Sequence, residues 1–392
     1  MGHLSNLFKS SLAGACLAGI FFSTSSEATN GDIRVGLNAI QSGMANAVIA
    51  SPESSATIFT NPAGLSNLDM QHMRMDLGFA LMNPPRAING VDSDSNLFFM
   101  PTGSIAFRKN PNLTLGMGFS ALAGFGMDVP DAFAAAPGDQ PFVTTKELLK
   151  FAPTFSRRIN PKLSLGASLD IYSQSLALST PAFTLPQNRQ FGFGLTLGGL
   201  YKASEQLQFG FSYASKGDMS AHEFNTTSGQ FTLDMDHPAI LNLGAAWTTQ
   251  GGLLIEGDIK QIYFSKVRDK VAVGRPTGYA GPVPSSLNFG WSDQTVIAIG
   301  LRKDISDKLT LRGGINHGSS PIESEDVNNN LGAAAIAETH VSIGATIHLN
   351  PHMMQNISFT HALNNSVTAS NGPANKLEMD QNVLTFNMTM TF

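Results

Sequence analysis

The last ten residues, Val383-Leu-Thr-Phe-Asn-Met-Thr-Met-Thr-Phe392, decide how the rest of this chain is interpreted. Every second residue in this stretch is large and apolar: Leu384, Phe386, Met388, Met390 and Phe392. Side chains alternate between the two faces of a strand, so one face is apolar and the other, rich in Thr and Asn, is polar. A strand of about ten residues with this pattern crosses a bilayer when tilted by about 45°. The alternative is the edge strand of a soluble sandwich.

The composition favours the membrane alternative. Only 14% of the 392 residues are charged and the mean hydropathy is neutral, which is unusual for a soluble protein. After residue 22 there is no run of about 18 apolar residues, so membrane-spanning helices are excluded and a β-barrel is the membrane fold that remains. The net charge is −5 and the Lys and Arg residues are scattered, so we expect no nucleic-acid partner.

The first 28 residues have the pattern of a secretory signal peptide. A lysine precedes the apolar run at 12–22, and small residues lead to a cleavage site after Ala28. Cys16, the only cysteine, lies within the apolar run, so the exported chain would have neither a disulfide nor thiol chemistry. A lipoprotein signal is a weak alternative, because Ala13 stands where such signals prefer Leu. We therefore expect export to a bacterial envelope.

The alternating pattern recurs along residues 72–392 and predicts an all-β fold, a transmembrane antiparallel barrel of about fourteen strands. Clear strands are expected at 73–81, 113–119, 163–171, 191–197 and 341–349, and weaker ones include 97–108 and 147–158. Short turns rich in Pro, Gly, Asn and Asp alternate with long links, at 83–96, 125–146, 178–189, 217–236, 266–291, 318–335 and 364–378. Outer-membrane barrels have short periplasmic turns and long outer loops, so this alternation predicts a barrel with both chain ends in the periplasm.

Residues 29–71 precede the first predicted strand and follow a different pattern. A run of small and apolar residues at helical spacing, at 38–50, indicates compact structure. An eight-stranded barrel fills its own interior and a sixteen-stranded barrel leaves a channel, so about fourteen strands leave a hole. We predict that residues 29–71 plug the barrel formed by residues 72–392.

This segment resembles the N-terminal hatch of the FadL/TodX (OmpP1) family of Gram-negative outer-membrane transporters. The resemblance rests on residues 42–47 and 54–65, the second of which contains Asn61-Pro62-Ala63, the sequence typical of that family. Further similar stretches follow, at 237–244, 254–258, 291–293, 311–314 and 319–322. The resemblance implies a fourteen-stranded barrel with a hatch in its lumen, capture of long-chain fatty acids or other hydrophobic compounds from outside, and no energy input of its own. Phe392 likewise resembles the terminal assembly signal of bacterial outer-membrane barrels.

The expected partners follow from the resemblance and the membrane pattern. They are a hydrophobic small molecule, outer-membrane lipid and lipopolysaccharide, and the barrel-assembly machinery, with the protein itself a monomer. We expect no cofactor, no metal and no catalytic residue. A water-filled porin, a surface adhesin and a lipid hydrolase with His340 or His348 as base are the alternatives.

If the apolar face of each strand meets lipid, the opposite face carries charged and polar residues into the lumen: Arg74, Asp76, Asp170, Gln174, Glu256, Asp258, Lys260, Arg302, Arg312, His340 and His348. Most of these are expected to pair with the plug, since unpaired buried charge is costly. Arg302 and Arg312 are candidates for holding a fatty-acid carboxylate, because guanidinium binds carboxylate with two hydrogen bonds. The family implies a basic residue toward the outer end of the fifth strand, but residues 172–178 contain none.

Apolar residues expected in the outer loops, Phe125, Met127 and Phe133, are candidates for a first capture groove, and loop packing explains them equally well. A lateral exit through the wall is expected at the third strand, where four glycines share the inward face: Gly116, Gly118, Gly124 and Gly126. The alternative is that inward glycines make room for the plug. Glycines on the inward face of another strand, at 192, 194 and 198, are explained in this way.

Overall fold

The computed structural model describes residues 30–130, 142–179, 184–281 and 283–392. The predicted signal peptide at 1–28 and the candidate residue Phe133 lie outside the described residues. The strands of the wall are β1 (Met73–Asn83), β4 (Phe98–Asn110), β5 (Leu113–Val129), β6 (Phe142–Phe151), β7 (Thr154–Asn160), β8 (Leu163–Ser179), β9 (Thr184–Lys202), β10 (Leu207–Ala214), β14 (Ile240–Thr248), β15 (Leu253–Ile262), β18 (Gln294–Ser306), β19 (Leu309–Gly318), β20 (Thr339–Asn350), β21 (Met353–Thr368) and β22 (Lys376–Thr391).

Shorter elements lie outside this wall. The strands are β2 (Arg86–Ile88), β3 (Val91–Asp92), β11 (Asp218–Met219), β12 (His222–Thr226), β13 (Gly229–Leu233), β16 (Lys270–Gly274) and β17 (Ser286–Asn288). The helices are α2 (Ala39–Gly43), η1 (Ser55–Phe59), η2 (Pro62–Asn67), α3 (Ser265–Arg268) and η3 (Val327–Asn329). Among the described residues, no helix is long and apolar enough to span a bilayer.

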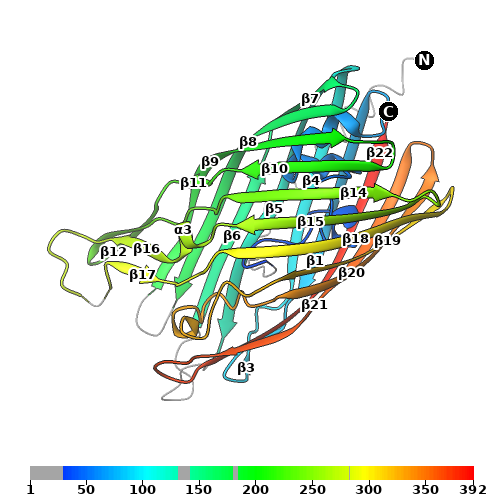
Figure 1. The fold of residues 1–392 in the computed structure, drawn as a ribbon. Helices are drawn as coiled ribbons and strands as arrows, with labels where there is room; N and C mark the ends of the chain where they lie inside the picture. Colours follow the sequence, from blue (N-terminus) through cyan, green and yellow to red (C-terminus); the bar gives the residue numbers. More distant parts are fainter. Residues whose placement is uncertain (1–29, 131–141, 180–183, 282) are drawn as a thin grey trace, which may run out of the picture.

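The wall is a closed antiparallel barrel with 14 strand positions among the described residues, which confirms the predicted fold (Figure 1). It closes between the first and last strands, where β1 pairs with β22 from Arg74 opposite Thr391 to Asn83 opposite Asn382. β6 and β7 occupy one position, since both pair with β5 and β8. The predicted strand at 147–158 is thus divided, at Ala152-Pro153, because proline has no N–H for the ladder.

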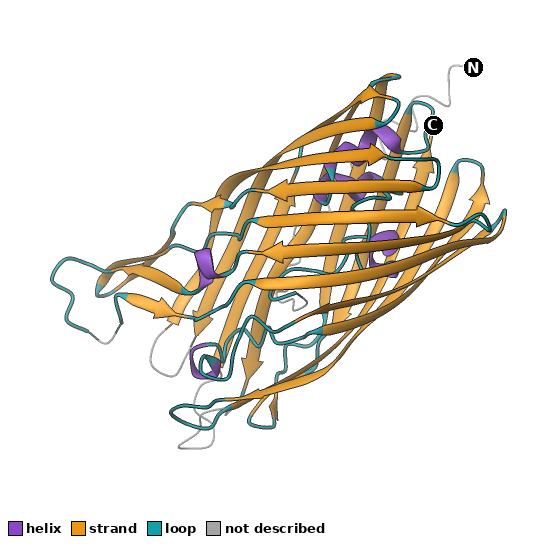
Figure 2. Cartoon of the chain, viewed as in Figure 1, coloured by secondary structure: helices purple, strands orange, loops and turns teal. Residues whose placement is uncertain are grey.

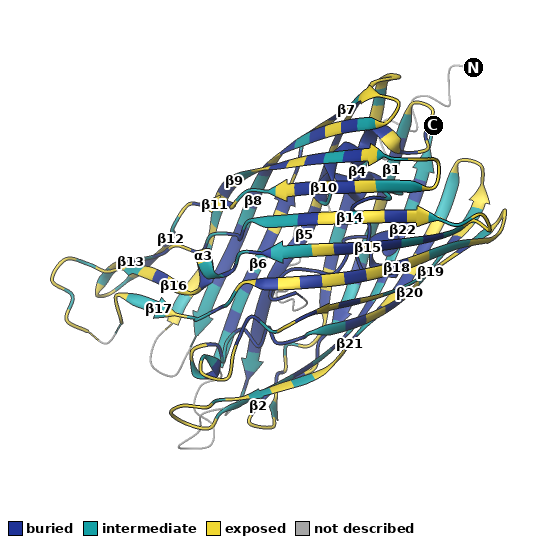
Figure 3. Cartoon of the chain, in the orientation of Figure 1, coloured by how far each residue is buried: buried dark blue, intermediate teal, exposed yellow. Residues whose placement is uncertain are grey.

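The two faces of the wall differ as the alternation predicts. Large apolar side chains on the outer face are exposed, among them Leu165, Phe193, Trp247, Ile299 and Ile343. The intervening positions face the lumen, where small and polar residues are buried, and Figure 3 shows the resulting stripes along the strands. An outer face of this kind is stable only in contact with hydrocarbon, because it would otherwise expose a continuous apolar surface to water.

The connections differ in length at the two ends of the barrel. At one end, here called the short-turn end, the links are brief, such as 111–112, 161–162 and 351–352, and Phe392 lies at this end (Figure 1). At the opposite, long-loop end, the links include 215–239 and 263–293 and contain the small sheet β12-β13-β16-β17. The predicted long link at 178–189 is wrong, since β8 and β9 extend until only 180–183 separate them.

Candidate functional site

Residues 30–71, here called the N-terminal segment, lie inside the barrel, and Figure 2 shows their short helices enclosed by strands. Residues 30–50 are all buried. Helix α2 begins because the Asn38 side chain accepts a hydrogen bond from the Gln41 N–H. The same helix packs closely on β20, where a methyl group added at Gly43 would lie 3.1 Å from the Cα of Gly344. Small residues therefore let the segment approach the wall backbone.

Asn61-Pro62-Ala63 anchors the segment to the wall. The Asn61 amide donates hydrogen bonds to the carbonyl oxygens of Ile49 at 2.8 Å and Gly199 at 3.1 Å. Its own oxygen accepts from the Ala63 N–H at 3.3 Å, and Pro62 opens η2, where its missing N–H costs nothing. A methyl group added at Gly198 would lie 2.8 Å from Pro62 Cδ, so glycine is required opposite the motif. These contacts fix the motif against Gly198 and Gly199 of β9.

Two wall carboxylates hold the middle of the N-terminal segment. Asp258 accepts hydrogen bonds from the N–H groups of Val48 at 2.7 Å and Ile49 at 3.1 Å, and Glu256 accepts one from Ala50 at 2.6 Å. The sequence placed both acids in the lumen, and it left their partners unidentified. Main-chain N–H groups carry no sequence signature, so pairing of this kind emerges only from the fold.

Arginines at the short-turn end hold the rest of the segment, and sequence reasoning missed two of them. Arg108 donates to the carbonyl oxygens of Leu68 at 2.7 Å and Met70 at 2.6 Å. Arg158 donates to the Ser66 carbonyl oxygen at 2.7 Å. The signal that could have found them is their position, since each lies one or two residues before a predicted short turn.

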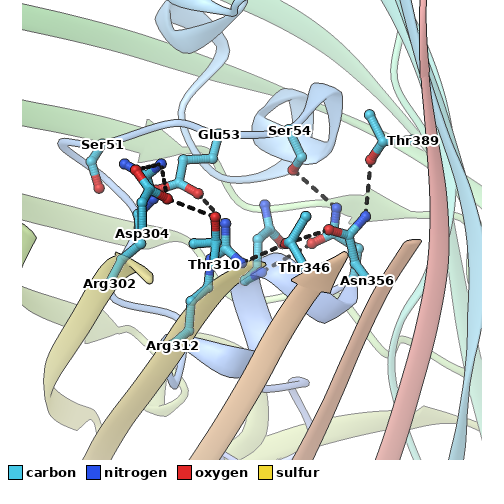
Figure 4. A network of polar contacts seen from close by, with 12 residues as sticks. Ser51, Glu53, Ser54, Arg302, Asp304, Thr310, Arg312, Thr346, Asn356 and Thr389 are labelled. Atoms are coloured by element: carbon cyan, nitrogen blue, oxygen red, sulfur yellow. Dashed lines mark hydrogen bonds and ion pairs between the residues drawn. The ribbon is translucent and has the colours of Figure 1, made fainter. Parts of the chain in front are cut away.

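Arg302 and Arg312, the predicted carboxylate ligands, are register partners on β18 and β19 and already bind a carboxylate (Figure 4). Arg312 Nη2 lies 2.5 Å from Glu53 Oε2, and Arg302 Nε lies 3.3 Å from Glu53 Oε1. Burial raises the pKa of Glu53, but the two guanidinium groups outweigh it and lower the pKa below the ordinary value. A cargo carboxylate would therefore have to compete with the N-terminal segment for these arginines.

Near the long-loop end, three buried cations face two buried carboxylates; we call Lys146, Lys150 and Arg268 the cation cluster. Lys146 pairs with Asp32, and Lys150 Nζ lies 2.8 Å from Asp170 Oδ2. Arg268 Nη2 lies 4.0 Å from Asp32 Oδ2, beyond hydrogen-bond distance. Arg268 Nε and Nη2 have no hydrogen-bond acceptor among the described residues. The Arg268 guanidinium thus has donors that no described acceptor uses.

Two members of the cation cluster lie on the strand next to residues 172–178 of β8. In the register of β6 against β8, Lys146 lies opposite Leu176 and Lys150 lies opposite Tyr172. Two lysines of the neighbouring strand β6 therefore lie opposite residues 172–178, which contain no basic residue. Sequence reasoning missed these cations because neither β6 nor the α3 segment has the clear alternation that assigns a side chain to the lumen.

Phe125 and Met127 lie on β5 and are buried, so their predicted place in an exposed outer loop is wrong. The Phe125 ring lies 5.6 Å from the Lys146 Nζ. Phe125 and Met127 both belong to an apolar cluster that includes Tyr172 and Trp291. Both faces of β5 are buried there, and its edge beyond the β4 ladder contacts the N-terminal segment. The cations of the cluster are therefore set against an apolar surface.

The four predicted exit glycines divide into two pairs. A methyl group at Gly116 would lie 2.8 Å from Leu65 Cδ1, and one at Gly118 would lie 2.8 Å from Phe59 Cζ, so these two make room for the N-terminal segment. Gly124 donates its N–H to the Asp32 carbonyl oxygen at 2.9 Å, and the Gly126 carbonyl oxygen accepts from Arg86. The second pair lies beyond the end of the β4–β5 ladder, in the part of β5 that stays paired with β6.

The hydrogen-bond ladder between β4 and β5 ends at Thr102 opposite Ser120, although both strands continue. Beyond that point Ile33 of the N-terminal segment bridges to Ala123, and Arg34 donates its N–H to the Leu122 carbonyl oxygen at 3.2 Å. The inward face beside this separation is apolar, and a distinct cluster lines it: Ala80, Met82, Phe98, Met100, Ala121 and Val383. β4 and β5 are therefore not paired with each other at a place where the lumen lining is apolar.

A family model described as "Outer membrane protein transport protein (OMPP1/FadL/TodX)" matches residues 29–392. This chain belongs to that family. It is therefore a member of a family of outer-membrane β-barrel transport proteins. The match extends over the N-terminal segment and the whole wall, in agreement with the predicted resemblance. Among the described residues there is no group of three or more side chains that could hold a metal ion.

Individual relatives are distant. The chain is 25% identical over 196 residues to the "47 kDa outer membrane protein" of Pasteurella multocida, with 45% of this chain and 44% of that protein covered. The toluene transporter TodX of P. putida has a TM-score of 0.73 at 18% identity, with 91% of this chain and 99% of that chain covered. A Pseudomonas aeruginosa FadL homologue gives 0.75 at 14%, with 92% and 100% covered. The chain spans less than half the length of the curated relatives it matches, and the structural likeness concerns the fold.

Proposed function

We propose that this protein carries hydrophobic small molecules passively across the outer membrane and releases them sideways through its wall. The observation that supports this most directly is the coincidence of two features, namely the end of the β4–β5 ladder and the apolar cluster around Met82 and Phe98. A long apolar molecule released into water would lose about 0.8 kcal/mol per exposed methylene. Sideways release into the bilayer avoids that cost.

The cargo class that we propose is a hydrophobic molecule with or without an acidic head group, which includes long-chain fatty acids. The cation cluster offers Arg268 donors without acceptors, and its Lys146 lies 5.6 Å from the Phe125 ring, an arrangement suited to a carboxylate attached to an apolar chain. Some solved relatives are described as toluene transporters, so neutral aromatic compounds form the second class. Replacing Arg268 with Gln should weaken an acidic cargo and leave a neutral one unaffected.

In this proposal residues 1–28 are a signal peptide, 29–71 the hatch and 72–392 the barrel, and the short-turn end faces the periplasm. The N-terminal segment closes the lumen because its contacts run around the wall, from Asn387 of β22 through Glu256 of β15 to Asn61 against β9. An open porin would lack such a segment. The hydrolase alternative has no support from His340, whose ring nitrogens have no hydrogen-bond partner among the described residues.

The exit is tested by linking β4 to β5 where they separate. Met100 and Leu122 form the second pair that the ladder would make if it continued beyond Thr102 and Ser120. Cysteines placed there, joined by a short reducible cross-linker, should stop uptake of a hydrophobic substrate into cells or vesicles until a reductant is added. The matched control is a pair at Phe107 and Leu115, which are already register partners. Equal uptake with the first pair closed and reduced would refute exit between these strands.

A further inference from the structure

A second binding region lies at the short-turn end, far from the separation of β4 and β5 along the barrel. It is a pocket of about 470 Å³, here called the mouth pocket, between Ser51–Glu53 of the N-terminal segment and the wall. Four cations line it: Arg158, Lys162, Lys202 and Arg302. Glu53 is the one carboxylate among the lining residues that the structure describes. The pocket is thus strongly cationic.

The cations of the mouth pocket are only partly neutralised. Arg158 donates to a main-chain carbonyl, which carries no net charge, and Lys202 pairs with Glu205, which is exposed at the rim. The Lys162 ammonium has no partner among the described residues. Positive charges that converge on one open pocket without matching carboxylates attract an anion from solution.

The Glu53 carboxylate already occupies part of the site, and this indicates which anion the site prefers. Glu53 presents its carboxylate to Arg302 and Arg312, and this pair recognises a carboxylate from two directions (Figure 4). Arg312 makes a hydrogen bond to it, whereas Arg302 Nε makes none and Arg302 Nη2 is shared with Asp304 at 2.9 Å. The Arg302 side of this arrangement is therefore the weaker contact, and it is the side that lines the pocket.

Apolar groups complete the pocket. Pro52, Pro161 and Leu254 line it together with the cations, so a short alkyl chain attached to the anion would also find contact. Inorganic phosphate would use only the charges.

We propose that the mouth pocket binds a small carboxylic acid, whose carboxylate replaces Glu53 at Arg302 and thereby loosens residues Ser51–Glu53. The site is distinct from the transport route proposed above, because it opens at the opposite end of the barrel from the cation cluster. An anion that binds from the short-turn side would therefore weaken the contacts between the wall and the N-terminal segment.

The test is calorimetric titration of purified, detergent-solubilised full-length mature protein with hexanoate, which is too short to partition strongly into micelles. Arg302→Gln should weaken hexanoate binding by about tenfold or more, since a hydrogen bond to a charged group is lost. Glu53→Gln should strengthen binding, because it removes the internal competitor. The two variants should thus change the hexanoate affinity in opposite directions. If the cluster were only structural, both variants would lower that affinity.

Three controls complete the experiment. Arg157→Gln, an exposed neighbour of Arg158 outside the pocket, should leave the affinity unchanged. Hexanol should not bind there, and inorganic phosphate should bind more weakly than hexanoate. Saturating hexanoate should increase amide hydrogen exchange in peptides covering 50–56. Weaker hexanoate binding by Glu53→Gln, or equal affinities for phosphate and hexanoate, would overturn the proposal. Failure of the transport proposal would leave these titrations unaffected.

Discussion

Lys146 of β6 forms an ion pair with Asp32 of the N-terminal segment, and both side chains are fully buried. The pair joins the start of that segment to the wall at β6, where Lys146 lies opposite Phe125 of β5. Removing one partner of such a pair leaves an uncompensated buried charge, which costs about 3–5 kcal/mol. Arg268 lies 4.0 Å from the same carboxylate and supplies additional positive charge.

Lys146→Met should therefore loosen residues 30–37 by about 3–5 kcal/mol, measured as the opening free energy from amide hydrogen exchange. The double variant Asp32→Asn/Lys146→Met should lose less than the sum of the two single variants, because no unpaired charge remains from the pair. Additive losses would mean that the two side chains act independently.

Deleting residues 30–71 should produce a large ion conductance in planar bilayers, because this segment lies in the lumen and contacts the wall on several sides. The same deletion should abolish retention of a hydrophobic ligand. Full-length protein is the control and should conduct little. Conductance that is the same with and without the segment would contradict its role as a plug.

Asn61→Ala should weaken the attachment of η2 to the wall, because the carbonyl oxygens of Ile49 and Gly199 lose the Asn61 side-chain donor. Each buried carbonyl left unsatisfied costs about 1–3 kcal/mol. The effect should appear as faster hydrogen exchange across 48–66 and as larger conductance fluctuations. Asn110→Ala, at an exposed turn, is the matched control and should change neither quantity.

The small sheet at the long-loop end should loosen in mild acid because of His222. Burial, together with the charge of Lys146, lowers the pKa of His222 from 6.5 to about 4. Since the folded state resists protonation and the unfolded state does not, stability is full above pH 6.5 and declines as the pH falls toward 4. Hydrogen exchange of β12 and β13 should accelerate over that window, and His222→Gln should flatten the dependence. Unchanged acceleration in this variant would assign the effect to another group.

Removing Phe392 should impair barrel assembly more than synthesis. Its backbone closes the barrel, since its N–H donates to the Met73 carbonyl oxygen at 2.8 Å, while its side chain is 52% exposed and free to be recognised. Heat-modifiable migration on gels measures the folded fraction. Phe392→Tyr should assemble normally, whereas normal assembly of the deletion would rule out the assembly-signal interpretation.

The alternation of apolar and polar residues determined the barrel from sequence alone, because a bilayer imposes the same constraint on each strand separately. Leu384 and Phe386 needed no knowledge of their neighbours to be assigned to the lipid-facing side. The small-residue run at 38–50 likewise indicated compact structure without a strand. Boundaries were less certain at the long-loop end, where β8 and β9 extend beyond the membrane-crossing region and no constraint from the bilayer acts on the sequence.

The tertiary structure decided what the lumen residues do. Lys146, Asp32 and Arg268 come from three elements distant in sequence, so no local pattern predicts that they meet. Arg302 and Arg312 could be placed together by their symmetric positions about a turn, but their partner Glu53 could not, because it lies in a segment without periodic structure. The end of the β4–β5 ladder has the same origin: Ala123 takes a backbone partner from Ile33 of the N-terminal segment and not from β4, while β5 stays paired with β6 on its other side.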